Sequence, residues 1–205
     1  MLTRIAVLVS GGGTNLQALL DAQSAGNIPH GRIVLVASSN PDAYALTRAE
    51  AAGIPARTLA GNTPEAVEAA LSALLDEYAV DLIVLAGFLT ILSPAFTARW
   101  PRRVLNIHPS LIPAFCGRGM YGLRVHEAAL ARGVKVTGAT VHFVNEIPDG
   151  GEILLQKAVE IRPDDTPQTL QRRVMETCEW QLLPRAVELV AAQLCQNNTK
   201  ERAHD

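Results

Sequence analysis

The sequence contains little cysteine and no long apolar run, and each shortage excludes a class of protein. Its three cysteines, an odd number with no CxxC pair, argue against a disulfide framework and against a zinc knuckle. No stretch approaches the roughly 18 to 20 uninterrupted apolar residues of a membrane-spanning helix. The N-terminal MLTRIAVLVSGGG is too short and too rich in glycine for a signal peptide. We therefore expect a cytoplasmic protein with reduced thiols and no membrane partner.

Basic charge is also scarce. Lysine and arginine total 18 against 20 acidic residues, the formal net charge is −2, and no basic stripe is visible in the 205 residues. Because nucleic-acid binding depends on neutralising phosphates, the composition predicts no nucleic-acid partner. An anionic ligand would have to be held by backbone amides or by a few fixed arginines.

The chain does contain a regular series of apolar runs separated by helical stretches. Continuous apolar runs are typical of strands that are covered on both faces, and alternation with helices is typical of βαβ units. The sequence thus predicts one α/β domain with a doubly wound, mostly parallel sheet and helices on both faces. The predicted strands are 4–10, 32–39, 54–59, 80–87 and 103–108.

Local punctuation predicts the ends of several helices. A hydroxyl residue precedes Pro64, Pro94 and Pro167, so helices should begin at these prolines. Glycines at positions 26, 53 and 133 follow helical runs, as left-handed caps should. After residue 133 two alternating segments, 134–144 and 151–161, predict further strands joined by a loop. The polar segment 196–205 predicts a disordered tail.

A glycine-rich turn, Gly11 to Gly13, separates the first strand from a helix that opens at Thr14 and Asn15. Glycines let backbone amides approach a ligand, and the free N–H groups of a helix start favour an anion. The turn is not a dinucleotide fingerprint, because Leu16 stands where a third glycine belongs and no acid occupies 38–40. Either a phosphate-binding loop or a tight turn without a ligand fits this pattern.

Asn106 and His108 end the strand at 103–108, just before Pro109. Residues two apart in a strand face the same side, so these two side chains should share a face while Leu105 and Ile107 pack on the other. An amide donor and an imidazole at the carboxyl end of a strand could hold a developing oxyanion. The alternative is an ordinary turn-capping asparagine beside a boundary histidine.

Asp149, in the loop between the two late strands, could complete this pair by orienting His108 and favouring its imidazolium. Its position before two glycines is equally typical of a turn. The remaining candidates for a metal site, His126, His142 and Cys116, lack zinc spacing, so no metal is predicted.

Five segments together resemble the phosphoribosylglycinamide formyltransferase family, from about residue 4 to about residue 190. They are VLVSGGGTNLQALLDA, DLIVLAGFLTILSPAF, LNIHPSLIPAF, GATVHFVNEIPDGGEILLQ and RRVMETCEWQLLP. The resemblance implies a Rossmann-like formyltransferase domain over 1–195 that ends in a C-terminal helix. Its N-terminal half, about 1–100, would bind the phosphate, and its second half, about 101–195, would bind folate and carry the catalytic residues.

The same resemblance implies the reaction and the residues that serve it. A formyl group would pass from 10-formyltetrahydrofolate, a co-substrate, to the amine of 5-phosphoribosylglycinamide, without a metal. The family's catalytic residues correspond to Asn106, His108 and Asp149. Its acceptor-binding residues correspond to Gly12, Gly13, Thr14, Asn15 and Glu179, and its folate-binding residues to Leu89, Thr90, Ile91, Leu92, Arg103, Asn106 and Val144.

Some positions depart from the family pattern. Pro64 and Thr90 stand where many relatives carry arginines, and Trp180 stands where a histidine is frequent, in a segment that is one residue longer. The glycine-containing segment 115–125 is also longer than usual.

Two other readings stay open at this point. One is another enzyme that uses 10-formyltetrahydrofolate, a deformylase or a tRNA formyltransferase, although the triplet His-Pro-Ser at 108–110 is unlike theirs. The other is a sugar-phosphate-binding module without catalysis. The sequence does not decide between a monomer and a homodimer.

Overall fold

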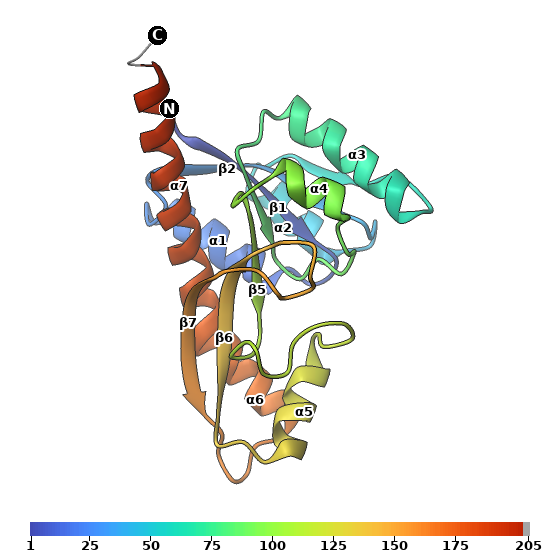
Figure 1. Ribbon diagram of the computed structural model, residues 1–205, viewed down its shortest axis with the longest axis vertical. Helices are drawn as coiled ribbons and strands as arrows, with labels where there is room; N and C mark the ends of the chain where they lie inside the picture. Colours follow the sequence, from blue (N-terminus) through green and yellow to red (C-terminus); the bar gives the residue numbers. More distant parts are fainter. Residues whose placement is uncertain (203–205) are drawn as a thin grey trace.

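A computed structural model describes the backbone of residues 1–202 and the side chains of residues 1–197. Within that part of the chain, a seven-stranded sheet has the order β3-β2-β1-β4-β5-β6-β7 (Figure 1). Strands β1 to β5 run parallel to one another, whereas β6 is antiparallel to both β5 and β7. The predicted doubly wound, mostly parallel sheet is confirmed. The strands are β1 Thr3–Val9, β2 Gly31–Ser38, β3 Ala56–Thr58, β4 Leu82–Leu85, β5 Val104–His108, β6 Val136–Phe143 and β7 Ile153–Glu160.

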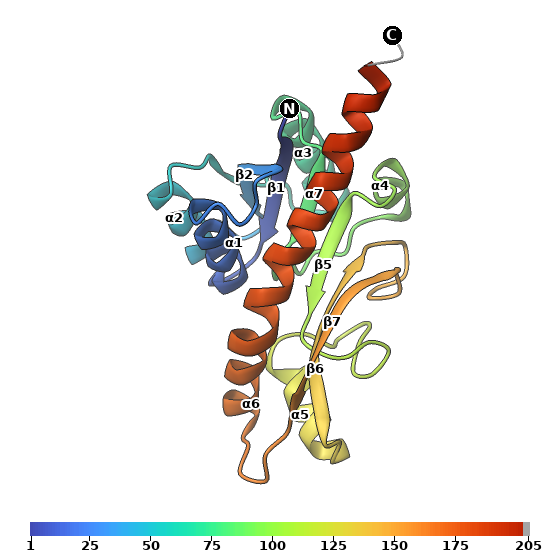
Figure 2. The ribbon, with the colours of Figure 1, turned by 90° about the vertical axis from the view of Figure 1, so that its left-hand side faces the viewer.

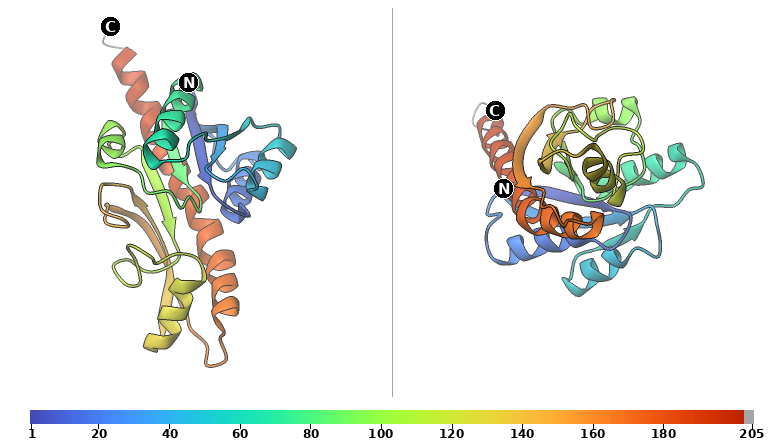
Figure 3. Two further views of the ribbon diagram at one scale, coloured as in Figure 1. Left: turned by 90° about the vertical axis from the view of Figure 1, so that its right-hand side faces the viewer. Right: turned by 90° about the horizontal axis from the view of Figure 1, so that it is seen from below.

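Helices cover both faces of this sheet. On one face α1, α2, α6 and α7 pack in one buried cluster (Figure 2), and on the other face α3 and α4 pack in a second cluster (Figure 3). Helix α5 lies against α6. The helices are α1 Thr14–Ser24, α2 Tyr44–Ala51, α3 Pro64–Glu77, α4 Pro94–Arg99, α5 Leu123–Arg132, α6 Pro167–Val174, the π-helix η1 Met175–Glu179 and α7 Trp180–Arg202.

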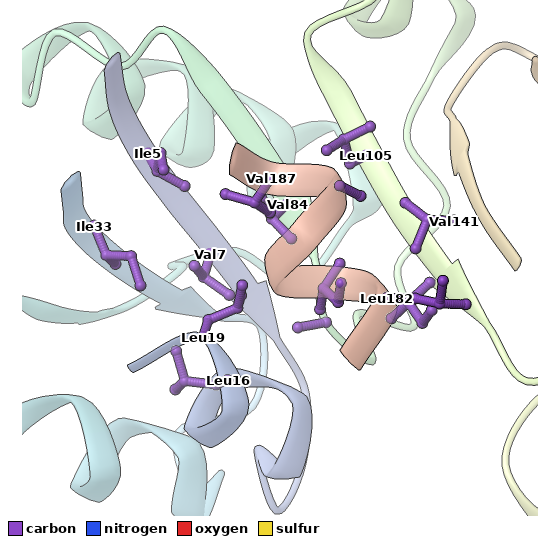
Figure 4. Close-up of a cluster of buried hydrophobic side chains, with 14 of the residues drawn as sticks. Ile5, Val7, Leu16, Leu19, Ile33, Val84, Leu105, Val141, Leu182 and Val187 are labelled. Atoms are coloured by element: carbon purple, nitrogen blue, oxygen red, sulfur yellow. The ribbon is translucent and has the colours of Figure 1, made fainter. Parts of the chain in front are cut away.

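The long C-terminal helix α7 forms the centre of the larger cluster. Figure 4 shows Leu182 and Val187 of this helix over side chains of β4, β5 and β6. Burying these apolar side chains away from water stabilises the contact between α7 and the sheet. The C-terminal helix is therefore held against strands from the earlier parts of the chain.

The predicted helix starts are confirmed. The side chains of Thr63, Ser93 and Thr166 each accept a hydrogen bond from the backbone N–H three residues later, and a proline follows each of them. The three predicted glycine caps, at positions 26, 53 and 133, have φ angles of 75°, 69° and 73°. These local signals therefore reported the helix ends correctly.

Helix α7 continues to Arg202, so it includes residues 196–202 of the segment for which the sequence predicts a disordered tail. The segment QNNTKER is polar, but it contains neither proline nor glycine, so nothing in it stops a helix. Residues 203–205 lie outside the described residues. No helix in the described part of the chain has both the length and the apolar character needed to cross a membrane.

The packing of α7 makes a prediction about stability. Leu183 is fully buried in the larger cluster, so Leu183→Ala should lower the free energy of unfolding by about 2–5 kcal/mol. The matched control is Leu189→Ala on the same helix, whose side chain is 39% exposed and should cost under about 1 kcal/mol. Urea denaturation of both variants measures the difference, and equal losses would contradict this packing.

Candidate active site

A cavity of about 120 Å³ lies among the end of β4, the middle of β5 and the loop between β6 and β7. We call Asn106, His108 and Asp149 the triad, and this cavity the triad cavity, because Asn106 and Asp149 contribute to its wall. Of the residues expected to bind folate, Leu89, Thr90, Ile91, Leu92, Asn106 and Val144 all line it. Arg103 is exposed and lies outside the set of described residues that form this wall. One expected contact is therefore not brought to the cavity.

Strand β5 presents Asn106 and His108 on one face of the sheet, as predicted. Leu105 and Ile107 point the other way, into the cluster that contains α7. Asp149 reaches the first two residues from the β6–β7 loop: its Oδ1 lies 3.3 Å from Asn106 Nδ2, and its Oδ2 lies 3.5 Å from His108 Nδ1. Both side chains therefore lie against one carboxylate. Asn106 donates to it, whereas His108 Nδ1 can donate to it only when the imidazole is doubly protonated, because the Nε2–H faces the Phe115 oxygen.

Asp149 is held in place by the fold of its own loop. Its φ angle of 57° is uncommon for a residue with a side chain, although aspartate tolerates it better than most. Its Oδ2 also accepts a hydrogen bond of 2.8 Å from the Gly117 N–H. A Cβ on Gly151 would lie 1.7 Å from the Phe143 carbonyl oxygen, so the loop can fold back against β6 only with glycine there. The Asp-Gly-Gly sequence thus serves both as a turn and as a means of placing the carboxylate.

The protonation of His108 differs from the expectation. Burial lowers the pKa of His108, and although Asp149 and the Phe115 carbonyl raise it, the net pKa lies below the ordinary value. Asp149 does favour the imidazolium of His108, as expected, but burial disfavours the charged ring more strongly than Asp149 favours it. His108 Nε2 lies 2.9 Å from the Phe115 oxygen.

The carboxyl group of Asp149 stays ionised. Burial raises its pKa, but the nearby imidazoles of His142 and His108 and the hydrogen bond from the Gly117 N–H together bring the net pKa below the ordinary value. A negative charge is thus kept beside Asn106 and His108.

His142 is a site residue that sequence reasoning missed. It lies directly opposite Asn106 in the β5–β6 ladder, and it is buried. Its Nδ1 lies 2.9 Å from the Phe143 oxygen, which can only accept, so Nδ1 carries the proton and Nε2 is an acceptor. Nε2 then accepts from Asn106 Nδ2 at 3.1 Å. This bond fixes the amide nitrogen of Asn106, rather than its oxygen, toward the cavity.

The phosphate loop, residues 10–13, precedes α1. Gly13 is the N-cap of that helix with a φ of 72°, and no side chain caps the helix. A Cβ on Gly11 or Gly12 would meet nothing within 4 Å, so the loop has one open side. The hydroxyl of Thr14 contacts Met175 Sδ at 3.7 Å. The predicted acceptor-binding residues Gly12, Gly13, Thr14 and Asn15 therefore lie where the loop passes into α1, with backbone amides at the start of this helix.

Glu179 joins the predicted acceptor-binding residues through Asn15, whose Nδ2 donates to Glu179 Oε2 at 2.7 Å. Burial raises the pKa of Glu179 to about 6, although the Asn15 hydrogen bond opposes the rise. The π-helix η1 contains this residue and accommodates one more residue than an α-helical turn would, which fits the longer segment noted in the sequence. Among the described residues, the buried Asn15 Oδ1 has no hydrogen-bond partner.

Hydroxyl groups connect the phosphate loop to the triad cavity. Ser10 Oγ accepts from the Leu89 N–H at 3.1 Å, and Ser39 Oγ accepts from the Thr90 hydroxyl at 3.3 Å. Ser39 lies where dinucleotide-binding folds carry an acid. In this chain its hydroxyl instead holds the segment that contains Thr90. Thr90, which replaces an arginine of many relatives, takes part in the connection.

The long segment after β5 also contacts the triad. Phe115 and Gly117 contribute the carbonyl and the N–H described above. Cys116 Sγ lies 3.2 Å from the Pro113 oxygen, and burial raises the pKa of its thiol. His126 is fully buried on α5, where burial and the nearby His108 lower its pKa to about 4. Pro64, one of the positions that depart from the family pattern, is the first residue of α3.

Comparison with known proteins identifies the class of protein to which this fold and site belong. A family model described as formyl transferase matches residues 3–187, and the chain belongs to this family. Phosphoribosylglycinamide formyltransferase of Haemophilus influenzae is 45% identical over 188 residues, which cover 90% of this chain and 85% of that protein.

Two further relatives extend the comparison. The trifunctional purine biosynthetic protein adenosine-3 of Homo sapiens is 44% identical over 193 residues, which cover 92% of this chain but only 18% of that protein. The crystal structure of glycinamide ribonucleotide transformylase 1 from Symbiobacterium toebii has a TM-score of 0.86 and 43% identity, covering 94% of this chain and 89% of that one.

The environment of Glu179 predicts an unusual titration. Its carboxyl signal in ¹³C NMR should titrate near the pKa of about 6, and Asn15→Ala should raise the midpoint further because the anion loses its donor. Ser24→Ala, an exposed change on α1, should leave it unchanged. A midpoint near 4.5, the ordinary value, would mean that Glu179 is in contact with water.

The same shift affects stability with a definite sign. Since folding raises this pKa, the folded state holds the proton more tightly than the unfolded state. The free energy of unfolding should therefore fall by about 2 kcal/mol in total as pH rises from well below 4.5 to well above about 6. Glu179→Gln should remove this part of the pH dependence.

Proposed function

We propose that this chain transfers the formyl group of 10-formyltetrahydrofolate to the amine of 5-phosphoribosylglycinamide. The products are phosphoribosyl-N-formylglycinamide and tetrahydrofolate, and the step belongs to de novo purine biosynthesis. One observation carries the proposal: Asn106 Nδ2 and His108 Nδ1 lie 3.3 and 3.5 Å from the carboxylate oxygens of Asp149, and Asn106 and Asp149 form part of the cavity wall. We also propose that the protein acts in the cytoplasm on these small molecules.

The cavity suits a flat, mostly apolar donor. Leu85, Phe88, Leu92 and Val144 supply its hydrophobic wall, and Asn106 and Asp149 supply polar groups at one side. An aromatic ring system bound there would lose its water against the apolar side chains while its formyl end faced the triad. Family membership and the apolar side chains of the cavity both support a folate-derived molecule as the formyl donor.

The acceptor is proposed to bind at the phosphate loop. Its phosphate would accept hydrogen bonds from the amides of 11–13 and from the start of α1, which attracts anions. Its ribosyl hydroxyls would meet Glu179 and the unpartnered Asn15 Oδ1. Both groups are acceptors once Glu179 is ionised, so binding should improve as pH rises through about 6.

Chemistry begins when the unprotonated amine attacks the formyl carbon. A new C–N bond forms, and the carbonyl oxygen becomes an alkoxide that Asn106 Nδ2–H and His108 are placed to stabilise. The two distances to Asp149, 3.3 and 3.5 Å, are long for hydrogen bonds, so the Asn106 amide, and His108 once it is protonated, can turn to a stronger acceptor. One donor of this kind commonly contributes roughly 2.7–4 kcal/mol to transition-state stabilisation.

Collapse of the intermediate requires one proton transfer. The attacking nitrogen loses a proton, the bond between the formyl carbon and the folate nitrogen breaks, and that nitrogen receives a proton. Ionised Asp149 is proposed to position a water that relays it. His108, whose pKa is low before reaction, becomes easier to protonate as the alkoxide charge develops beside it. Neither a covalent enzyme intermediate nor a metal enters this scheme.

The test is an acceptor comparison with one donor. Purified protein is mixed with 10-formyltetrahydrofolate and either phosphoribosylglycinamide, water alone or methionyl-tRNA, and release of tetrahydrofolate is followed by absorbance. Turnover should require phosphoribosylglycinamide. Equal turnover in water alone would identify a deformylase, and binding of the acceptor without turnover would identify a sugar-phosphate-binding module.

Removal of the amide donor tests the mechanism itself. Asn106→Ala should lower kcat on the order of 10²–10³-fold with little change in either KM, because the bond matters mainly in the transition state. Asn27→Ala, an exposed asparagine after α1, serves as the matched control. A near-normal kcat for Asn106→Ala would rule out its role as an oxyanion donor.

A further inference from the structure

Three successive carbonyl groups of the phosphate loop bond to one segment, residues 40–48. Asn40 Nδ2 donates to the Ser10 oxygen at 3.3 Å, and the Ala45 N–H donates to the Gly11 oxygen at 3.1 Å. Arg48 Nε donates to the Gly12 oxygen at 2.8 Å. Every carbonyl from 10 to 12 thus faces the segment that leads into and forms α2.

The geometry of the peptide bond converts these contacts into a direction for the amides. In a trans peptide the N–H points away from the preceding carbonyl. Fixing the carbonyls of 10, 11 and 12 therefore turns the N–H groups of 11, 12 and 13 away from α2. The open space beside Gly11 and Gly12 leaves room for a ligand.

Arg48 makes the shortest of the three bonds, and it is itself held from several sides. Its Nη1 donates to Gln17 Oε1 at 2.9 Å, and Gln17 Nε2 donates to Asp21 Oδ1 at 2.9 Å. Its guanidinium carbon lies 5.0 Å from the centre of the Tyr44 ring. A Cβ on Gly13 would lie 2.6 Å from Ala45 Cβ, so glycine at 13 lets α2 approach closely enough for this contact.

We propose that Arg48 is a positioning residue for the acceptor's phosphate. It does not touch the phosphate; it holds the Gly12–Gly13 peptide with its N–H toward the ligand. A charged donor on the carbonyl also polarises that peptide, so its N–H becomes a better donor. The inference rests on the proposed function for the identity of the acceptor, but the anchoring of the loop stands on the contacts above.

The test separates a positioning role from a merely structural one. Arg48→Met should raise KM for phosphoribosylglycinamide roughly tenfold, the effect of losing one charge-assisted bond, while kcat and the KM for the folate donor change less than about threefold. Arg48→Lys, which keeps a charged donor, should recover part of the loss. An unchanged acceptor KM in Arg48→Met, with wild-type thermal unfolding, would overturn the proposal.

Arg57 supplies a matched control. It too lies over a tyrosine ring, 5.8 Å from the centre of Tyr78, and bonds to a backbone carbonyl, but it lies on β3. Arg57→Met should leave all kinetic constants unchanged. An acceptor without the phosphate, glycinamide riboside, sharpens the comparison: Arg48→Met should not impair its formylation. Equal losses with both acceptors would mean a general defect and would contradict the proposal.

Failure of the proposed function would be recognised separately. If the wild-type chain formylates no acceptor, inorganic phosphate becomes the probe, and its binding is followed through the NMR amide signals of Gly11 to Gly13. Weaker phosphate binding by Arg48→Met than by Arg57→Met would support the positioning role. Equal affinity of the two variants would overturn it.

Discussion

The antiparallel pairing of β5 with β6 is the constraint on which the candidate site depends. It sets His142 opposite Asn106, where a parallel strand reached through a crossover would have placed another residue. It also starts the β6–β7 loop beside Val104, at the wrong end of β5 for the triad. The loop must therefore fold back over the face of the sheet, and Gly151 allows the close approach that this path requires. The position of the Asp149 carboxylate follows from that turn.

The remaining parts of the site are held by the parallel half of the sheet. The phosphate loop follows β1, and its carbonyls are fixed by the segment around α2. Glu179 reaches the same place from η1 because α7 packs across the sheet in the cluster of Figure 4. Serine and threonine hydroxyls then connect this region to the cavity beside β5. Two binding regions from different parts of the chain are thus fixed relative to one another by packing and by short hydrogen bonds.

Much of this arrangement could be predicted because its signals are local. Alternation within five residues placed Asn106 and His108 on one face, and hydroxyl-proline pairs located three helix starts. What escaped prediction depends on contacts between distant residues. His142 acts through strand register, and Arg48 acts through the approach of α2 to a loop 36 residues earlier. The charge of His108 was misjudged because burial, which no short motif reveals, outweighs the neighbouring carboxylate.

Strands β5 and β6 assemble Asn106 and His142 into one unit, in which His142 acts by orienting the amide of Asn106. A double-mutant cycle on kcat tests this coupling, with Asn106→Ala, His142→Ala and the double variant compared with the wild type. We expect His142→Ala to lower kcat about tenfold or more in the wild type but to have little further effect once Asn106 is alanine. If the two losses simply multiply in the double variant, His142 acts independently of Asn106, and the two residues do not form one unit.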